Sequence, residues 1–205
     1  LLGAMVVSCL FWGGGALVQM SINSVGKQQL LAGHERADTW TSVLAASIAI
    51  GIAIGSVLSG FLSRGRINVK VLRYGCCGIL LFMFLLSIPG PRDHHLLGYW
   101  GCFVTMILLG VATGLFYVPL QTFIQARPLD NIKGRILATT GMANWIAILL
   151  CAVLYSGFDY IIKINDWPRS YLFALSALLF LPIVLFYHPD EADMNQSQPM
   201  PPCLE

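Results

Sequence analysis

The sequence has 205 residues, of which 57% are hydrophobic and only 11% are charged. Soluble domains carry roughly 25% charged residues, so this composition excludes an ordinary soluble protein and indicates an integral membrane protein. The formal net charge of +2 is too small to indicate binding to nucleic acid. We therefore expect the lipid bilayer as the main partner of the chain.

Six mainly apolar runs follow one another along the chain. A bilayer core about 30 Å thick is crossed by about 20 residues of helix, and each run has roughly this length. We expect an all-α membrane protein with a six-helix bundle over residues 1–188 and a flexible cytoplasmic tail over residues 189–205. The expected spans are residues 1–25, 40–62, 71–88, 98–125, 136–158 and 168–187.

The first span begins at Leu1, inside an apolar run that no charged segment precedes. We expect a further segment upstream, because a natural N-terminus or a signal peptide starts differently. Gln19 and Asn23 stand one helical turn apart in this span and share a face.

Small residues recur at every fourth position of the second span, and a shorter pair occurs in the fourth. Without bulky side chains two helix backbones can approach closely, so this pattern predicts a helix-packing stripe. The residues are Ser47, Gly51, Gly55 and Ser59 in the second span, and Gly110 and Gly114 in the fourth.

Neutral polar side chains lie within the fourth and fifth spans. Tyr117, Gln121 and Gln125 follow each other at a spacing of four, and Asn144 stands beside Trp145 in the fifth span. An amide that faces lipid without a hydrogen bond costs about 1–3 kcal/mol, so these groups should face another helix or a wet cavity. Both readings stay open: hydrogen bonds between helices, or contacts to a substrate.

Proline 119 lies among these polar residues, in the middle of the fourth span. Proline removes one backbone hydrogen bond, so Pro119 predicts a kink beside the polar face.

Positive charges concentrate in two of the five loops. Cytoplasmic loops retain an excess of Lys and Arg, so these two loops are expected in the cytoplasm, as are both chain ends. The arginines of these loops either only set the topology of the chain or also form a gate. The charges are Arg64, Arg66, Lys70 and Arg73 after the second span, and Arg127, Lys133 and Arg135 after the fourth.

Charged residues and histidines are absent from the middle of all six spans. The sequence has no C-x-x-C or Cys/His spacing typical of a metal site, and no H-E-x-x-H pattern of a metalloenzyme. We expect no metal, no cofactor and no catalytic residue.

The loop after the second span carries a familiar motif. Gly60, Arg64, Gly65 and Arg66 resemble G-x-x-x-D-R-x-G-R, which major facilitator transporters carry between the second and third helices of each half. Ser63 stands at the position of the acidic residue, so the match is incomplete. The resemblance implies the C-terminal half of a 12-helix major facilitator fold, with an N-terminal six-helix half as its partner.

The segment from Gly114 to Arg135 is similar to the tenth-to-eleventh helix region of lysophospholipid transporters. It is especially similar to bacterial polypeptides in which that module is fused to, or encoded beside, an acyl-ACP synthetase and an acyltransferase. The residues that carry the likeness are Gly114, Pro119, Leu120, Gln125, Arg127, Gly134 and Arg135.

This resemblance implies a multi-pass transporter of the bacterial inner membrane that moves 2-acyl lysophospholipid to the cytoplasmic leaflet for reacylation. Tyr117, Gln121, Asn144, Trp145, Gln19 and Asn23 would then line the substrate cavity, and Arg64, Arg66, Arg127 and Arg135 would form a cytoplasmic gate.

Two alternatives remain beside this interpretation. A facilitator that exports another small amphiphile or a drug would share the fold but not the lipid. A non-transporting accessory or truncated membrane subunit would share only the spans.

Overall fold

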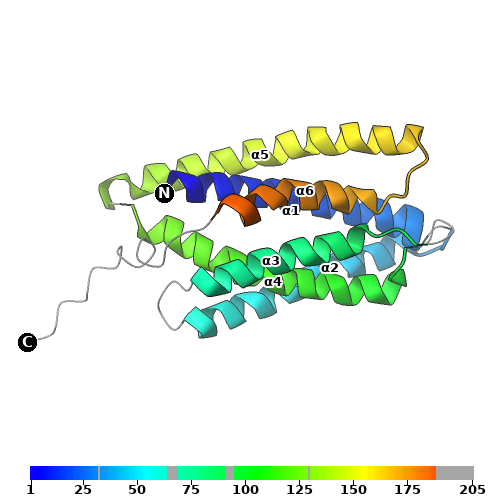
Figure 1. The fold of residues 1–205 in the computed structure, drawn as a ribbon, viewed down its shortest axis with the longest axis horizontal. Coiled ribbons are helices and arrows are strands. Elements are labelled where there is room, and N and C mark those ends of the chain that lie inside the picture. Colours follow the sequence, from blue (N-terminus) through cyan, green and yellow to red (C-terminus); the bar gives the residue numbers. More distant parts are fainter. Residues whose placement is uncertain (32, 64–68, 91–94, 129, 188–205) are drawn as a thin grey trace, which may run out of the picture.

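The apolar runs form long helices because a helix pairs its own backbone groups, which water cannot do inside lipid. The computed structural model describes residues 1–31, 33–63, 69–90, 95–128 and 130–187 (Figure 1). Within these ranges the fold is all-α, as expected. The elements are α1 (Leu2–Val25), the π-helix η1 (Gly26–Leu30), α2 (Ala37–Ser63), α3 (Val69–Ser87), α4 (Gly98–Ala126), α5 (Asp130–Ile164) and α6 (Tyr171–Phe186).

Five of these helical segments in the described ranges are long and apolar enough to cross a membrane. The expected sixth span is shorter than the sequence predicted, because α6 has 16 residues and begins at Tyr171 rather than at residue 168. At 1.5 Å per residue it is about 24 Å long. Asp166, with a φ of 50°, turns the chain before it. The amides of Tyr171 and Leu172 bond to carbonyls three residues earlier, which tightens this entry.

Two other spans extend well beyond their predicted bounds. α5 extends over Asp130–Ile164 rather than residues 136–158, and the first span continues through η1 to Leu30. α4 runs through Pro119 to Ala126 without interruption. The kink at Pro119 stays a prediction.

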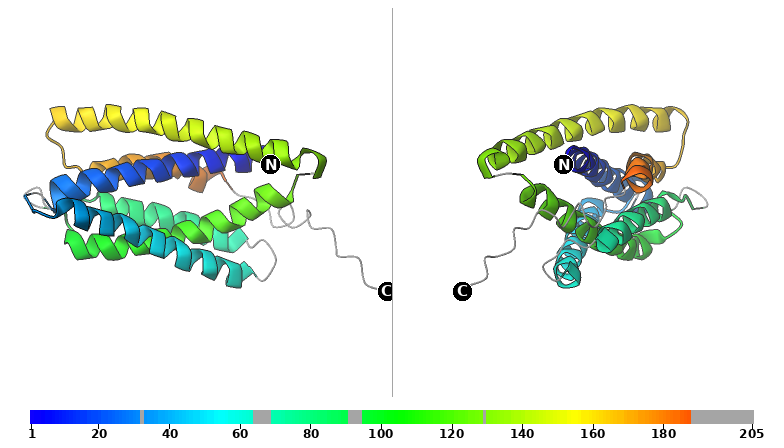
Figure 2. Two further views of the ribbon diagram at one scale, coloured as in Figure 1. Left: turned by 180° about the vertical axis from the view of Figure 1, so that it is seen from behind. Right: turned by 60° about the vertical axis from the view of Figure 1, so that its left-hand side comes forward.

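The helices pack in a repeated pattern. α4 packs along α2 and α3, whereas α1 packs along α5 and α6, and α3 meets α6 (Figure 2). If the labels α1, α2 and α3 are exchanged with α4, α5 and α6 in that order, the set of packed helix pairs stays the same. The bundle therefore has the contact pattern of two equivalent three-helix units.

The small-residue stripe lies where α2 meets α4. A Cβ on Gly51 would overlap the carbonyl oxygen of Ile107, and one on Gly55 would overlap that of Val111. From the other side, a Cβ on Gly110 or Gly114 would overlap the α2 backbone. Ser47 and Ser59 are buried on the same face of α2.

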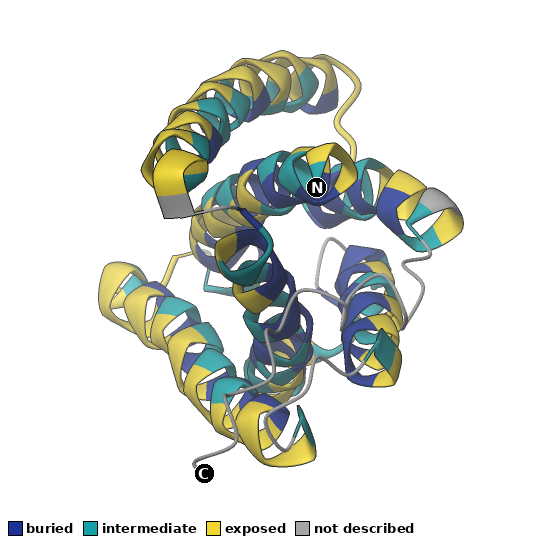
Figure 3. Cartoon of the chain, turned by 90° about the vertical axis from the view of Figure 1, so that its left-hand side faces the viewer, coloured by how far each residue is buried: buried dark blue, intermediate teal, exposed yellow. Residues whose placement is uncertain are grey.

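Exposed residues lie on the outward faces of the helices and buried ones toward the middle of the bundle (Figure 3). The outward faces are apolar: Phe61, Leu81 and Val153 are all more than half exposed. Such a surface is suited to lipid and not to water.

The two ends of the bundle carry different connections (Figure 1). The N-terminus and the α4–α5 connection lie at one end, called here the N-terminal end. The α1–α2 and α5–α6 connections lie at the opposite end. Arg64, Arg66 and the tail over residues 189–205 lie outside the described residues.

Candidate functional site

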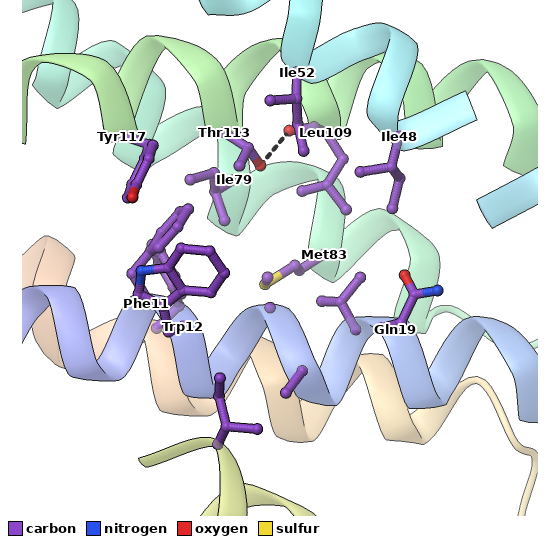
Figure 4. A pocket seen from close by; sticks show the side chains of 15 residues that line it. Phe11, Trp12, Gln19, Ile48, Ile52, Ile79, Met83, Leu109, Thr113 and Tyr117 are labelled. Carbon is purple, nitrogen blue, oxygen red and sulfur yellow. Dashed lines mark hydrogen bonds between the residues drawn. The ribbon is translucent and has the colours of Figure 1, made fainter. Parts of the chain in front are cut away.

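An apolar pocket of about 420 Å³ lies mainly between α1, α3 and α4, with contributions from α2, α5 and α6. Figure 4 shows Phe11 and Trp12 of α1 on one side of it, facing Tyr117 of α4 on the other. Ile79 and Met83 of α3 form its floor. A hydrocarbon chain can enter such a space at little cost, because its walls resemble lipid.

Aromatic rings hold this pocket in shape. Phe11 stacks on Tyr117 with ring centroids 5.0 Å apart and an angle of 14° between planes. Trp12 meets the same tyrosine edge-on at 5.8 Å, and Phe180 of α6 meets Phe11 at 6.2 Å. Such contacts contribute about 0.5–1.5 kcal/mol per pair beyond buried area. The pocket wall is therefore preorganised.

A second pocket, of about 380 Å³, adjoins the first toward the N-terminal end, between α4 and α5. Trp12, Tyr117 and Ile148 line both pockets, so the two spaces share a wall. Three amides line the second pocket, whereas Gln19 supplies the one amide among the lining residues of the first. The three amides of the second pocket belong to Gln121, Gln125 and Asn144, and Thr140 adds a hydroxyl. We call the two spaces the apolar pocket and the amide pocket.

One residue of the amide pocket, Asn144, is bonded to α1. The hydroxyl of Ser8 donates to Oδ1 of Asn144 at 3.2 Å, and Ser8 itself is buried. The bond fixes one face of the Asn144 amide.

The structure brings most of the predicted cavity residues together. Tyr117, Gln121, Asn144 and Trp145 all line the amide pocket, and Gln19 lines the apolar pocket. Asn23 lines neither, because its amide donates back to the carbonyl of Gln19 at 3.1 Å.

Phe11, Trp12 and Thr140 are among the lining residues of the two pockets that the sequence analysis did not single out. Trp12 carried a usable signal, since tryptophan prefers the membrane interface and Trp12 lies in mid-span.

The basic residues at the N-terminal end lie beyond the amide pocket. The guanidinium carbon of Arg127 is 5.2 Å from the centroid of the Phe123 ring, a cation–π contact, and Arg135 is exposed. The structure thus places Arg127 two residues past Gln125, at the end of α4. Their gating role stays a prediction.

The fold and these pockets define a multi-pass helical membrane protein with an amphiphilic cavity inside the bundle. The chain matches no protein-family profile. It is similar to the lysophospholipid transporter LplT of Photorhabdus laumondii, with 29% identity over 154 residues. This stretch covers 75% of the present chain but 36% of that relative, so the chain spans just over a third of the relative's length.

Proposed function

We propose that this protein carries a lysophospholipid across the membrane, holding its single acyl chain in the apolar pocket and its headgroup in the amide pocket. The observation that carries the proposal is the shared wall of Trp12, Tyr117 and Ile148 between one apolar and one amide-lined space. The similarity to a lysophospholipid transporter supports the same substrate class.

The physical obstacle to lipid movement is the headgroup. A polar group taken into hydrocarbon without hydrogen bonds costs about 2–7 kcal/mol, and a charged group costs more. The acyl chain pays no such cost, because it moves from one apolar medium to another. Gln121 and Asn144 supply the hydrogen bonds that the bilayer lacks, so the barrier falls for an amphiphile whose headgroup reaches them.

The proposed architecture is the C-terminal half of a major facilitator transporter. Two three-helix units with equivalent contacts are typical of such a half, in which substrate binds near the midplane between two lobes. Trp12, Gln19 and Trp145 are exposed on the side where the pockets open, so an N-terminal six-helix half would cover them. A fused or adjacent acyltransferase or acyl-ACP synthetase is a further proposed partner.

The proposed orientation places the N-terminal end of the bundle in the cytoplasm of a bacterial cell, with the membrane being the inner one. Lys70, Arg73, Arg127, Lys133 and Arg135 all belong to this end, which follows the positive-inside rule. In this orientation the amide pocket lies on the cytoplasmic side of the apolar pocket. The headgroup would leave toward the leaflet in which reacylation takes place.

Transport is tested with the full-length protein in proteoliposomes, by following the movement of a fluorescent lysophosphatidylethanolamine between leaflets. The wild type should move it well above protein-free liposomes. Gln121→Leu, which keeps the size but removes the amide, should lower the rate about tenfold or more. Equal rates combined with a lower unfolding midpoint would instead make Gln121 an interhelical hydrogen-bonding residue.

A competition measurement separates this function from export of another amphiphile. Unlabelled lysophosphatidylethanolamine should compete with the fluorescent lipid, whereas cationic amphiphilic drugs should not. Competition by the drugs alone would assign the pockets to a drug exporter.

A further inference from the structure

A third pocket, of about 490 Å³, lies at the end of the bundle opposite the amide pocket. It is formed by η1, the end of α5 and the turn before α6, and Gln29, Lys163, Asp166, Trp167 and Arg169 line it. None of these residues lines the apolar or the amide pocket. We call it the outer polar pocket.

Gln29 is the unusual residue of this pocket. Only 6% of it is exposed, and neither its amide nitrogen nor its amide oxygen has a hydrogen-bond partner in the described structure. A buried amide without partners costs about 1–3 kcal/mol, so such groups normally find one. An unpaired amide that lines a pocket is therefore a candidate contact for a ligand that supplies the partner.

Charged residues lie beside Gln29 in this pocket. Asp159 lies next to this pocket, and its carboxylate bonds both to Arg169 and, at 2.7 Å, to Nζ of Lys163. One carboxylate thus serves two cations, and the second carboxylate of the pocket, Asp166, is exposed. Arg169 is also mostly buried, with 18% of its side chain exposed, and a guanidinium has five N–H donors. Donors remain for an anion beside the Gln29 amide.

The rim of the pocket has a different character. Asp166 and Trp167 are both exposed. Tryptophan prefers the headgroup level of a membrane, and the exposed carboxylate is placed to meet a cation outside the pocket.

We propose that the outer polar pocket binds a phosphate group, with Gln29 donating through its amide nitrogen and with Arg169 and Lys163 supplying the positive charge. A phosphate oxygen can accept from the buried Gln29 amide and from the guanidinium of Arg169, and such charge-assisted hydrogen bonds are stronger than those to a neutral acceptor. The site is separate from the proposed transport cavity, so binding here does not rest on the proposed function. The phosphate belongs either to a lipid headgroup or to free phosphate.

The test measures the unfolding midpoint of the full-length protein in lipid nanodiscs, titrated separately with sn-glycero-3-phosphoethanolamine and with inorganic phosphate. The titrations are made in the Gln121→Leu variant, which lacks an amide of the amide pocket. The rise in unfolding midpoint that remains therefore reports binding at the outer polar pocket. Tighter binding of glycerophosphoethanolamine assigns a lipid headgroup. Equal or tighter binding of inorganic phosphate assigns free phosphate, and both results support the proposal.

Gln29→Leu identifies the residue responsible. It should weaken the binding of either probe about tenfold or more. The unfolding midpoint without probe should stay unchanged or rise, because an unpaired buried amide is replaced by an apolar group of similar size. The matched control is Asn165→Leu, since Asn165 is exposed nearby and does not line the pocket.

Two results would overturn the proposal. One is the absence of stabilisation by both probes in the protein with Gln29 intact. The other is unchanged probe affinity in Gln29→Leu, which would make Gln29 irrelevant to any ligand. Loss of lipid movement in Gln121→Leu bears on the proposed function and not on this site.

Discussion

At the scale of single residues, Gly15 tests whether the apolar pocket holds an acyl chain. It lines that pocket, and a Cβ added to it would meet nothing within 4 Å. Gly15→Leu should therefore fold normally while filling part of the cavity. Transport of lysophospholipids with long chains should fall several-fold, and that of short-chain forms should fall less, when rates are measured over a chain-length series.

Gly3→Leu is the matched control for this experiment. Gly3 also has open space around it, but it lines neither pocket. If Gly15→Leu lowered the transport rate equally for all chain lengths, the apolar pocket would not be the site that holds the acyl chain.

His95, in the connection between α3 and α4, predicts a pH dependence of stability. It is buried, its Nε2 is 2.7 Å from the carbonyl of Leu86, and its Nδ1 accepts from the amide of Leu97. This pattern fits the neutral ring with its proton on Nε2. Burial lowers the pKa of His95 below its ordinary 6.5, although the bond to Leu86 opposes the shift.

The direction of this pH dependence follows from the uptake of a proton on unfolding. Below about pH 6.5 the unfolded chain binds a proton that the folded His95 resists, so the free energy of unfolding decreases as the pH falls. The unfolding midpoint, measured between pH 7.5 and 5, should fall more in the wild type than in His95→Gln. The exposed His34 is the control, and His34→Gln should retain the full slope.

The polar residues of the pockets could be singled out from the sequence, whereas most of the aromatic ones could not. Tyr117, Gln121 and Asn144 stood out because amides and hydroxyls are costly in lipid. Phe11 could not be predicted as a pocket residue, since an aromatic residue in an apolar span gives no signal until its partner on another helix is known. Gln29 was hidden as well, because only the packed structure shows that its amide is buried and unpaired.

At the scale of helices, the contact between α2 and α4 predicts which glycines are indispensable. A Cβ on Gly55 would overlap the backbone of Val111, which cannot move aside as a side chain can. Gly55→Ala should lower the free energy of unfolding by about 1–3 kcal/mol. Unfolding by a denaturing detergent measures this loss.

Gly60 provides the comparison on the same helix. A Cβ there would meet nothing within 4 Å, so Gly60→Ala should leave stability unchanged or raise it, because alanine favours the helix. Equal effects of both substitutions would mean that α2 and α4 do not approach as closely as described.

Helix boundaries could be predicted only in part. The four-residue period of small side chains marked the α2–α4 contact, since close approach of two backbones demands it. The start of α6 could not be predicted, because the positive φ of Asp166 and the tight turn after it delay the helix. The extension of the first span through η1 was also unexpected, since a π-helical turn leaves no periodic signal.

At the scale of the whole molecule, three pockets are distributed along the bundle. The outer polar pocket lies at one end, the apolar pocket inside the bundle, and the amide pocket nearer the N-terminal end. Two equivalent three-helix units could not be recognised from the sequence, because the symmetry lies in the contacts. The fold class and the polar face followed from composition and spacing, whereas the separation of apolar and polar pockets required the structure.

The central claim is that one amphiphile occupies both pockets, with its tail in one and its headgroup in the other. Photo-crosslinking tests it most directly, using the full-length protein and lysophospholipids that carry a diazirine at the tail end or in the headgroup. Mass spectrometry should locate tail adducts at Ile79, Met83 or Phe180 and headgroup adducts at Gln121 or Asn144, all reduced by unlabelled lysophospholipid. Adducts confined to the outward residues Leu81, Phe84 and Val153 would contradict the claim.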